Sequence, residues 1–472
     1  MIKPDKVSDF VWQLPKTGKM NVPGIIYASD KLMDAIKQDK TLEQASNVAC
    51  LKGIQKAAYI MPDAHQGYGF PIGGVAAFDI DEGVISPGGV GYDINCSVRL
   101  LRTDLSFDDF LKKRKELIDA LFINVPAGVG KGGRTKVSRE ELMEVLAKGA
   151  KWAVSSGYGV ADDFKKTEEN GCMPADPNEV SSRAVQRGLP QLGSLGAGNH
   201  FLEMQRINKI FDEKIAKSFG IDRNDNITIM VHCGSRGLGH QVASDYIKSM
   251  EERYGFEGLP DRELINAPIN SELGQSYYKA MSAAANFAFA NKQMITHWVR
   301  ETFNKIYGNI DIDVVYDVCH NIAKIEKHNI DGSMKKVCVH RKGATRSFGP
   351  GREEIPEAYR SVGQPVIIPG SMGTASYVLV GTKKAEEVSF GSTAHGAGRV
   401  SSRTAALHNI NGEHVRNELA KRGIDVKATS WKSIAEEAPE VYKDIDEVVR
   451  VSKEAGLGMP VVRLVPISVM KG

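Results

Sequence analysis

The sequence predicts an α+β fold in which mixed sheets are surrounded by helices within one large domain, residues 1–472. Long helical patterns and many short strand patterns occur together, but not in the regular strand–helix–strand order of a Rossmann array. No linker, low-complexity stretch or repeat divides the chain. The P-loop signature GxxxxGK[ST] is also absent. We therefore expect neither a Rossmann fold nor a P-loop fold.

The first part of the chain changes from strand-like to helix-like patterns. Residues 22–102 contain short strand patterns, such as AAFDI at 76–80 and SVRLLR at 97–102, between Gly/Pro turns. Residues 106–155 show the apolar spacing of helices, and 156–178 form a loop-rich stretch. Helical spacing returns near residues 207–218, 240–255 and 274–306.

The later part of the chain adds most of the apolar strands. A helix is expected near 431–455, before a last strand. Short β-branched, apolar runs predict strands at 227–233, 313–319, 335–341, 365–370, 376–381 and 461–471.

Composition indicates a soluble globular protein, with 42% hydrophobic and 25% charged residues. No apolar run approaches the roughly 18 residues needed to cross a bilayer, and the first residues lack the apolar core of a signal peptide. We therefore expect a cytoplasmic protein with no membrane contact. A net charge of +3 means that any nucleic acid must bind a local basic patch. The six cysteines include no CxxC pair, which argues against a disulfide scaffold or a zinc ribbon.

Polar residues at strand ends offer metal ligands. Asp93 and Cys96 follow a glycine turn in SPGGVGYDINCSVR, and His200 leaves the loop LGAGNHFLE. His232 and His320 each end an apolar strand, in VHCGSRGLGH and DVCHNIA. This mixed O, N and S set is too large for one tetrahedral zinc but suits two ions that share a thiolate. A turn aspartate, a buried cysteine and core histidines remain the structural alternative.

Strand alternation separates the cysteines from the histidines beside them. Period-two geometry places Cys233 on the opposite face from His232, and Cys319 on the opposite face from His320. We expect both thiols to fill the core. The remaining histidines lie in helix-like or turn contexts, and we expect structural roles for His240, His297, His328, His408 and His414.

A glycine-rich segment, FGSTAHGAGRVSSR, surrounds His395 with small residues. The small neighbours leave room for a nucleotidylated imidazole, and Arg399 can hold phosphate oxygens. A neutral imidazole can attack phosphorus at physiological pH. The loop PGSMGTASYVL, with Ser371, Met372 and Ser376, can cradle a base and ribose. A turn with a surface histidine and a plain hairpin are the alternatives.

Basic, glycine-spaced segments are candidates for phosphate contacts. HRKGATRSFGPGR carries Arg341 and Arg346, SSRAVQRG carries Arg187, and the turn after His232 carries Arg236. Such loops can follow a phosphate chain, although solvated surface loops explain them equally well. Asp63 and His65, in MPDAHQGYGFPIGG, are polar groups that could lie near a reacting end.

Together these motifs resemble the RtcB family of RNA ligases. The resemblance runs from MPDAHQGYG to Lys471 and rests on GYDINCSVR, GAGNHFLE, VHCGSRGLGH, DVCHNIA, HRKGATR, PGSMGTASY and STAHGAGR. It implies an RtcB-like fold and two manganese ions bridged by Cys96, one with Asp93 and His200 and the other with His232 and His320. It also implies that His395 becomes guanylated by GTP. The implied guanine-nucleotide contacts are Asn199, His200, Phe201, Leu202, Glu203, His320, Asn321, Pro369, Gly370, Ser371, Met372, Ser376, His395, Gly396, Ala397, Gly398 and Lys471.

The implied reaction joins RNA 2′,3′-cyclic phosphate or 3′-phosphate ends to 5′-hydroxyl ends, with tRNA exon halves as substrates. The resemblance leaves open whether the accessory protein archease acts as an activator. Two rival functions follow from the residues alone. A dinuclear metallophosphoesterase without nucleotide dependence explains the ligand set but not His395. A non-catalytic RNA-binding or release-factor-like protein would need basic and aromatic surfaces, and aromatic residues make up only 7% of the chain.

Overall fold

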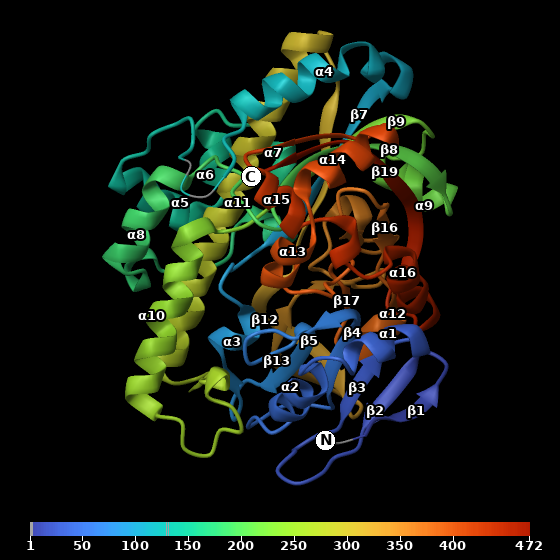
Figure 1. Cartoon of the computed structure of the whole chain (residues 1–472). Helices are drawn as coiled ribbons and strands as arrows, with labels where there is room; N and C mark the ends of the chain where they lie inside the picture. The colour runs from blue at the N-terminus through green and yellow to red at the C-terminus, as the bar shows by residue number, and fades with distance from the viewer. Residues whose placement is uncertain (1–2, 129, 131) are drawn as a thin grey trace.

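The computed structural model describes residues 3–128, 130 and 132–472, and it has the predicted α+β architecture. Two large mixed sheets lie one above the other in Figure 1, and helices cover their outer faces. No helix in these ranges is long and apolar enough to cross a bilayer.

The lower sheet in Figure 1 has seven strands within the described residues and contains the N-terminal part of the chain. Its two edges are far apart in sequence, because β13 and β12 join the N-terminal strands through the antiparallel pairing of β13 with β5. In spatial order the strands are β1 (Asp5–Ser8), β2 (Val11–Leu14), β3 (Gly24–Tyr27), β4 (Ala58–His65), β5 (Ile72–Asp79), β13 (Ser333–Lys342) and β12 (Asn321–Ile330).

The upper sheet has eight strands in the described part of the chain and is antiparallel apart from β18, which pairs with β19 in parallel. The strands are, in order, β11 (Ile312–Cys319), β7 (Ser97–Ser106), β9 (Asn226–Cys233), β8 (Phe201–Ile210), β19 (Met459–Lys471), β16 (Ser376–Val380) and β15 (Pro365–Ile368), with β18 (Asp425–Ala428) beside the end of β19.

Both faces of the upper sheet are buried. On β7, Leu101 and Leu105 pack toward the helices, whereas Val98 and Leu100 pack toward the inside of the curved sheet. This division follows the alternation of side chains along a strand. The helices on the outer face are α4 (Phe107–Asn124), α5 (Arg139–Lys148), α6 (Ala150–Ser155), α7 (Ala161–Lys165), α8 (Ser182–Gly188), α10 (Arg236–Tyr254) and α11 (Glu272–Tyr307).

The remaining elements are short. Two pairs of strands, β6 (Val84–Ile85) with β10 (Ala267–Pro268) and β14 (Ala344–Arg346) with β17 (Ser392–Ala394), lie outside the large sheets. The other α-helices are α1 (Asp30–Ile36), α2 (Thr41–Val48), α3 (Pro87–Val90), α9 (Glu213–Phe219), α12 (Lys383–Ser389), α13 (Arg403–Asn409), α14 (Gly412–Lys421), α15 (Trp431–Glu436) and α16 (Ile445–Glu454).

Three expected elements differ from the structure. The helix expected over 207–218 begins only at Glu213, because β8 continues to Ile210 and Asp212 caps the helix. The helix expected over 431–455 is two helices, α15 and α16, separated by a turn at Pro439, where proline interrupts helical hydrogen bonding. His320 precedes a second strand rather than a polar turn, since β11 ends at Cys319 and β12 begins at Asn321.

That last difference matters for the site. β11 belongs to the upper sheet and β12 to the lower sheet, so the chain passes from one sheet to the other at His320. The imidazole is therefore held where the two sheets meet.

Candidate active site

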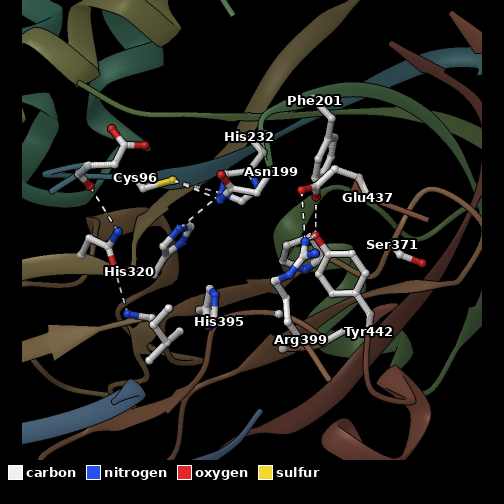
Figure 2. A pocket seen from close by; sticks show the side chains of 18 of the residues that line it. Cys96, Asn199, Phe201, His232, His320, Ser371, His395, Arg399, Glu437 and Tyr442 are labelled. Atoms are coloured by element: carbon white, nitrogen blue, oxygen red, sulfur yellow. Dashed lines mark hydrogen bonds and ion pairs between the residues drawn. The ribbon is translucent and has the colours of Figure 1, made fainter. Parts of the chain in front are cut away.

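A cavity of about 430 Å³ lies where strands of the two sheets converge. Asp93 and Cys96 reach it from the segment between α3 and β7, and His232 reaches it from the end of β9. His395, just after β17, and Lys471, the last residue of β19, close other sides. Figure 2 shows Cys96, His232, His320 and His395 at one end, with Phe201, Arg399 and Tyr442 at the other.

The five predicted metal ligands form two overlapping groups. Cys96, His232 and His320 make one group, and Asp93, Cys96 and His200 make the other, with ligand atoms within 4.8 Å of one another in each. The Cys96 sulfur lies 3.2 Å from Nε2 of His232 and 3.5 Å from Nε2 of His200. Donor atoms around one ion at bond lengths of about 2.0–2.3 Å are spaced by roughly such distances. Each group therefore fits one divalent cation.

The thiol of Cys96 belongs to both groups and is the natural bridge between them. Burial and the neighbouring Asp93 carboxylate raise the pKa of Cys96 to about 12 in the metal-free protein. A cation would reverse this preference, because only the thiolate binds a metal and the ion's charge outweighs that of the carboxylate. Metal binding at this site should therefore release a proton.

The surrounding backbone orients the ligands. Nδ1 of His200 lies 3.1 Å from the carbonyl oxygen of Leu195, which can only accept, so Nδ1 donates to it. Nε2 faces Oδ2 of Asp93 at 2.8 Å, and a metal bound between them would take the place of the Nε2 proton. Gly234 is required beside Asp93, because a Cβ atom at position 234 would lie 2.4 Å from its carboxylate oxygen. The glycines of these motifs thus let ligands approach the backbone closely.

The cysteines predicted to fill the core do so. Cys233 is fully buried on the helix side of the upper sheet and contacts the carbonyl oxygen of Leu195 at 3.0 Å and the amide nitrogen of Asn291 at 3.2 Å. Cys319 is also buried against this core. Among the described residues, neither thiol belongs to a metal-ligating group.

His395 lies against the metal groups and is held by Asp63. Its ring centroid is 4.9 Å from that of His320. Its Nδ1 is 2.6 Å from Oδ2 of Asp63, and the same oxygen accepts the backbone N–H groups of His395 and Gly396. Burial alone would raise the pKa of Asp63, but His395 and these hydrogen bonds hold it below its usual range. An ionised Asp63 favours a proton on Nδ1, the ring nitrogen that faces it.

The other end of the cavity carries a buried carboxyl group. Burial raises the pKa of Glu203 to about 8, although Gln205 and Lys471 act against this increase. Lys471 donates to the carbonyl oxygen of Gly198 and lies 3.5 Å from Glu437. This end therefore combines an acceptor and a cation in a site largely closed to water.

The predicted nucleotide contacts separate into two sets, and those outside the cavity lining are His200, Leu202 and Ser376. Leu202 is buried in the core, because alternation along β8 points Phe201 and Glu203 toward the cavity and Leu202 away from it. Ser376 does not line the cavity, and its hydroxyl accepts the N–H of Gly370, which does. Those that line the cavity are Asn199, Phe201, Glu203, His320, Asn321, Pro369, Gly370, Ser371, Met372, His395, Gly396, Ala397, Gly398 and Lys471.

Two of the predicted RNA contacts are wrong. Arg341 is fully buried in β13 and forms a bidentate pair with Glu326. Arg346 is 1% exposed and pairs with Glu168 and Glu169. Both guanidinium groups neutralise buried carboxylates, so neither can follow a phosphate chain at the surface. The basic segment 340–352 is largely strand rather than a flexible loop.

The other predicted RNA residues have mixed positions. His65 lines the cavity, whereas Arg187 is exposed on α8 and donates to Gln241. Arg236 begins α10 and contacts the hydroxyl of Ser194. Arg399 lines the cavity, but its donors are directed at Glu437, Tyr442, Ser401 and the backbone of Glu436.

Several lining residues were not predicted. Tyr92 directly precedes the predicted ligand Asp93, and Lys342 lies within a predicted basic motif. The sequence motifs could therefore have pointed to both residues. His240, expected to be structural, lines the cavity instead. Glu437 and Tyr442 come from the turn between α15 and α16, where no motif marks them. Burial lowers the pKa of Lys342 to about 7.

Comparisons with known proteins show the family of this chain. The family model described as tRNA-splicing ligase RtcB matches residues 44–472. A protein named tRNA-splicing ligase RtcB from Thermococcus kodakarensis is 56% identical, with 100% of this chain and 99% of that protein covered. Proteins of the same name from Archaeoglobus fulgidus and Methanococcus maripaludis are 55% and 53% identical, with 98% or more of each chain covered. The chain therefore belongs to the RtcB family.

Proposed function

We propose that this protein is an RNA ligase that uses GTP to join RNA 2′,3′-cyclic phosphate or 3′-phosphate ends to 5′-hydroxyl ends through a guanylated His395. One observation carries the proposal. A histidine positioned by a buried aspartate shares a single cavity with two metal-ligating groups and with a buried carboxyl group. A simple phosphoesterase would need only the metal groups.

The buried carboxyl group favours guanine over the other bases. The guanine edge presents two N–H donors, N1–H and the amino group, and a carboxylate such as that of Glu203 can accept both. Adenine offers an acceptor at the equivalent position and would leave the carboxylate poorly paired. Phe201 and Tyr442 provide apolar surface beside Glu203, and Ser371 adds a hydroxyl group.

His395 is suited to attack phosphorus. Asp63 fixes the tautomer by holding the Nδ1 proton, so Nε2 presents its lone pair without a separate base. Gly396, Ala397 and Gly398 follow the histidine, and Gly398 adopts φ = +72° in close contact with the Asp63 carbonyl. The small residues leave space for a bulky adduct on the ring.

The donor set fits two divalent cations, and we propose manganese for both. One would be held by Asp93, Cys96 and His200, and the other by Cys96, His232 and His320. Bound there, such ions neutralise phosphate charge and stabilise attacking and leaving oxygens.

Three transfers follow. Nε2 of His395 attacks the α-phosphorus of GTP, the bond to the bridging oxygen breaks, and pyrophosphate leaves. An oxygen of the RNA 3′-phosphate then attacks the same phosphorus, the P–N bond breaks, and the electron pair returns to the imidazole. Finally the 5′-hydroxyl of the second strand attacks the activated 3′-phosphorus, and GMP leaves. Activation is required because an unmodified phosphate oxygen is a poor leaving group.

Cyclic ends need one additional step. A 2′,3′-cyclic phosphate must first be hydrolysed to the 3′-phosphate, because only a phosphate monoester has the free oxygen that accepts the guanylate. We propose that this opening occurs in the same cavity. The relatives are named tRNA-splicing ligases, which supports tRNA exon halves as the natural RNA. We also propose archease as a candidate activator.

A joining assay tests the proposal. One labelled RNA with a 3′-phosphate and one RNA with a 5′-hydroxyl are incubated with the protein, Mn²⁺ and GTP. We expect a joined product that disappears when GTP is omitted or replaced by ATP, and when the second RNA carries a 5′-phosphate. Loss of the terminal phosphate without joining, at the same rate with and without GTP, would instead identify a metallophosphoesterase.

A further inference from the structure

Three aromatic side chains form a continuous surface in the wall of the cavity, which we call the aromatic ledge: Tyr68, Tyr92 and His240. The rings of Tyr92 and His240 are stacked, with centroids 4.7 Å apart and planes inclined by 25°. Tyr68 packs edge-on against Tyr92 at 5.4 Å. Tyr68 and Tyr92 are half-buried, and His240 is exposed. The ledge thus presents an accessible π-surface, although none of its members ligates a metal in the described groups.

The ledge lies on the Asp93 side of the metal groups. Tyr92 is the residue immediately before Asp93, and all three rings line the same cavity as Glu203 and Lys471. That cavity also contains two other aromatic side chains, Phe201 and Tyr442, at the end proposed for guanine. A mononucleotide needs one such surface, and the ledge provides a second.

The surroundings of the ledge favour a nucleic-acid strand. Arg187 is an exposed residue of α8 that packs beside Gly237, about one turn before His240 on α10. Partial burial and Arg187 lower the pKa of His240, against the effect of Asp93. The imidazole is therefore neutral at physiological pH, which suits stacking. Proteins recognise single-stranded RNA by stacking unpaired bases on aromatic side chains beside a cationic surface.

We propose that the aromatic ledge binds the terminal nucleobase of the RNA strand that carries the 5′-hydroxyl. This inference rests on the proposed function. In the last transfer the attacking hydroxyl and the departing GMP must lie on opposite sides of the phosphorus, because the displacement is in line. GMP occupies the end with Glu203 and Lys471. The strand that brings the hydroxyl therefore approaches from the opposite, Asp93 side, where the ledge lies.

The test compares normal RNA with RNA that has an abasic 5′-terminal nucleotide. The KM for the 5′-hydroxyl strand is measured for both RNAs, and their ratio is taken within each protein. This ratio removes any general effect of a substitution on metal or GTP binding. The proteins are the wild type, Tyr92→Leu, which removes the ring, and Tyr92→Phe, which keeps it. Tyr254→Leu, at an exposed tyrosine at the far end of α10, is the matched control.

We expect the abasic strand to raise KM roughly tenfold in the wild type, since stacking of one base contributes about that factor. The same ratio should hold in Tyr92→Phe and Tyr254→Leu and fall close to one in Tyr92→Leu. A ratio near one in the wild type, or an unchanged ratio in Tyr92→Leu, would overturn the proposal. An abasic 3′-terminal nucleotide whose effect vanishes in Tyr92→Leu would assign the ledge to the other strand and also overturn it.

Failure of the proposed function gives a different result. In that case the wild-type protein forms no guanylate on His395 and joins no RNA, normal or abasic, and the ledge proposal falls with it. A wild type that joins RNA normally, with no base-dependent effect of Tyr92, would leave the ligase function intact and refute the ledge alone.

Discussion

The contact between Asp63 and His395 bears on which ring nitrogen can act in the proposed reaction. Asp63 is fully buried, and its Oδ2 faces Nδ1 of the imidazole at 2.6 Å. The arrangement resembles the use of a buried carboxylate to fix a histidine tautomer in hydrolases. In the proposed reaction Nε2, the ring nitrogen that faces away from Asp63, is therefore the attacking atom.

Replacing Asp63 by asparagine should therefore slow guanylylation while preserving the fold. The amide either turns its N–H toward Nδ1, against the two backbone N–H groups that point at this position, or presents an oxygen without the charge that holds the Nδ1 proton. We expect the rate of label transfer from α-labelled GTP to fall on the order of 10³-fold or more. Asp30→Asn, in an exposed pair with Lys6, is the control and should label normally. Normal labelling of Asp63→Asn would show that the aspartate does not set the tautomer.

Substitutions of Cys96 and Cys233 should have opposite effects on metal binding. Cys96→Ala removes a ligand common to both metal groups, so we expect loss of bound manganese and of RNA joining. Cys233→Ala removes only contacts in the core, at a cost of about 1 kcal/mol, and should keep both. Elemental analysis of the purified variants measures the metal content. Retention of metal by Cys96→Ala together with its loss in Cys233→Ala would refute the assignment of strand faces.

The raised pKa of Glu203 predicts that the affinity for GTP depends on pH. Burial raises the pKa of this carboxyl to about 8, so the group is mostly protonated at pH 6.5, whereas guanine requires the ionised form. Binding below pH 8 must release a proton, and affinity should rise by up to about tenfold per pH unit between pH 6 and 8, then level off. Glu203→Gln should bind GTP more weakly at pH 8.5 and lose this slope. The titration of GTP itself affects the wild type and Glu203→Gln equally. An equal slope of GTP affinity against pH in the two proteins would therefore contradict the assignment of Glu203 to guanine binding.

Secondary-structure elements show how far the sequence could anticipate the site. The strands that end at Cys233 and Cys319 were predictable from apolar, β-branched runs, and the histidines beside these cysteines belong to the candidate metal groups. The passage of the chain between sheets at His320 was not, because no turn residue marks it and strand pairing is set by distant segments. The basic segment around Arg341 was misjudged because its partner, Glu326, lies on the neighbouring strand β12. Pairing across strands leaves no trace in local composition.

Glu437 and Tyr442 illustrate the same limit. They reach the cavity from the turn between α15 and α16, and only the packing of the C-terminal helices brings them to Lys471. Their neighbours in sequence contain no glycine-rich loop or strand end that would indicate a site. Candidate ligands at strand ends could be proposed from sequence patterns, whereas cavity residues that only tertiary packing brings together could not.

A buried ionic cluster fixes α11 to the upper sheet and sets the stability of that contact. Asp317 on β11 pairs with Lys292 on α11 at 2.5 Å and with Arg99 on β7 at 2.8 Å, and all three side chains are fully buried. Asp317→Asn would leave two buried cations without an anion. We expect the free energy of unfolding to fall by about 3–5 kcal/mol. Chemical denaturation of the variant measures this loss.

A surface pair provides the comparison. Glu144 and Lys148 on α5 are both more than half exposed, so Glu144→Gln should change the free energy of unfolding by less than about 0.5 kcal/mol. Equal effects of Asp317→Asn and Glu144→Gln would show that the buried cluster does not anchor the helix.

The fold as a whole brings together side chains from distant parts of the chain. The metal ligands span positions 93 to 320, His395 comes from a later loop, and Lys471 ends the last strand. Two sheets joined at His320 create the cavity, and its two ends differ in chemistry: metal ligands and the aromatic ledge at one, a buried carboxyl group and a lysine at the other. This division matches a reaction that holds a nucleotide and RNA ends at the same time.

Intact-protein mass spectrometry after incubation with GTP and Mn²⁺ tests the central claim most directly. The account predicts a mass increase of one guanylate, mapped by peptide analysis to His395, that is absent from His395→Ala. The adduct should disappear when RNA with a 3′-phosphate is added. An unmodified wild-type protein, or an adduct that persists in His395→Ala, would contradict the account.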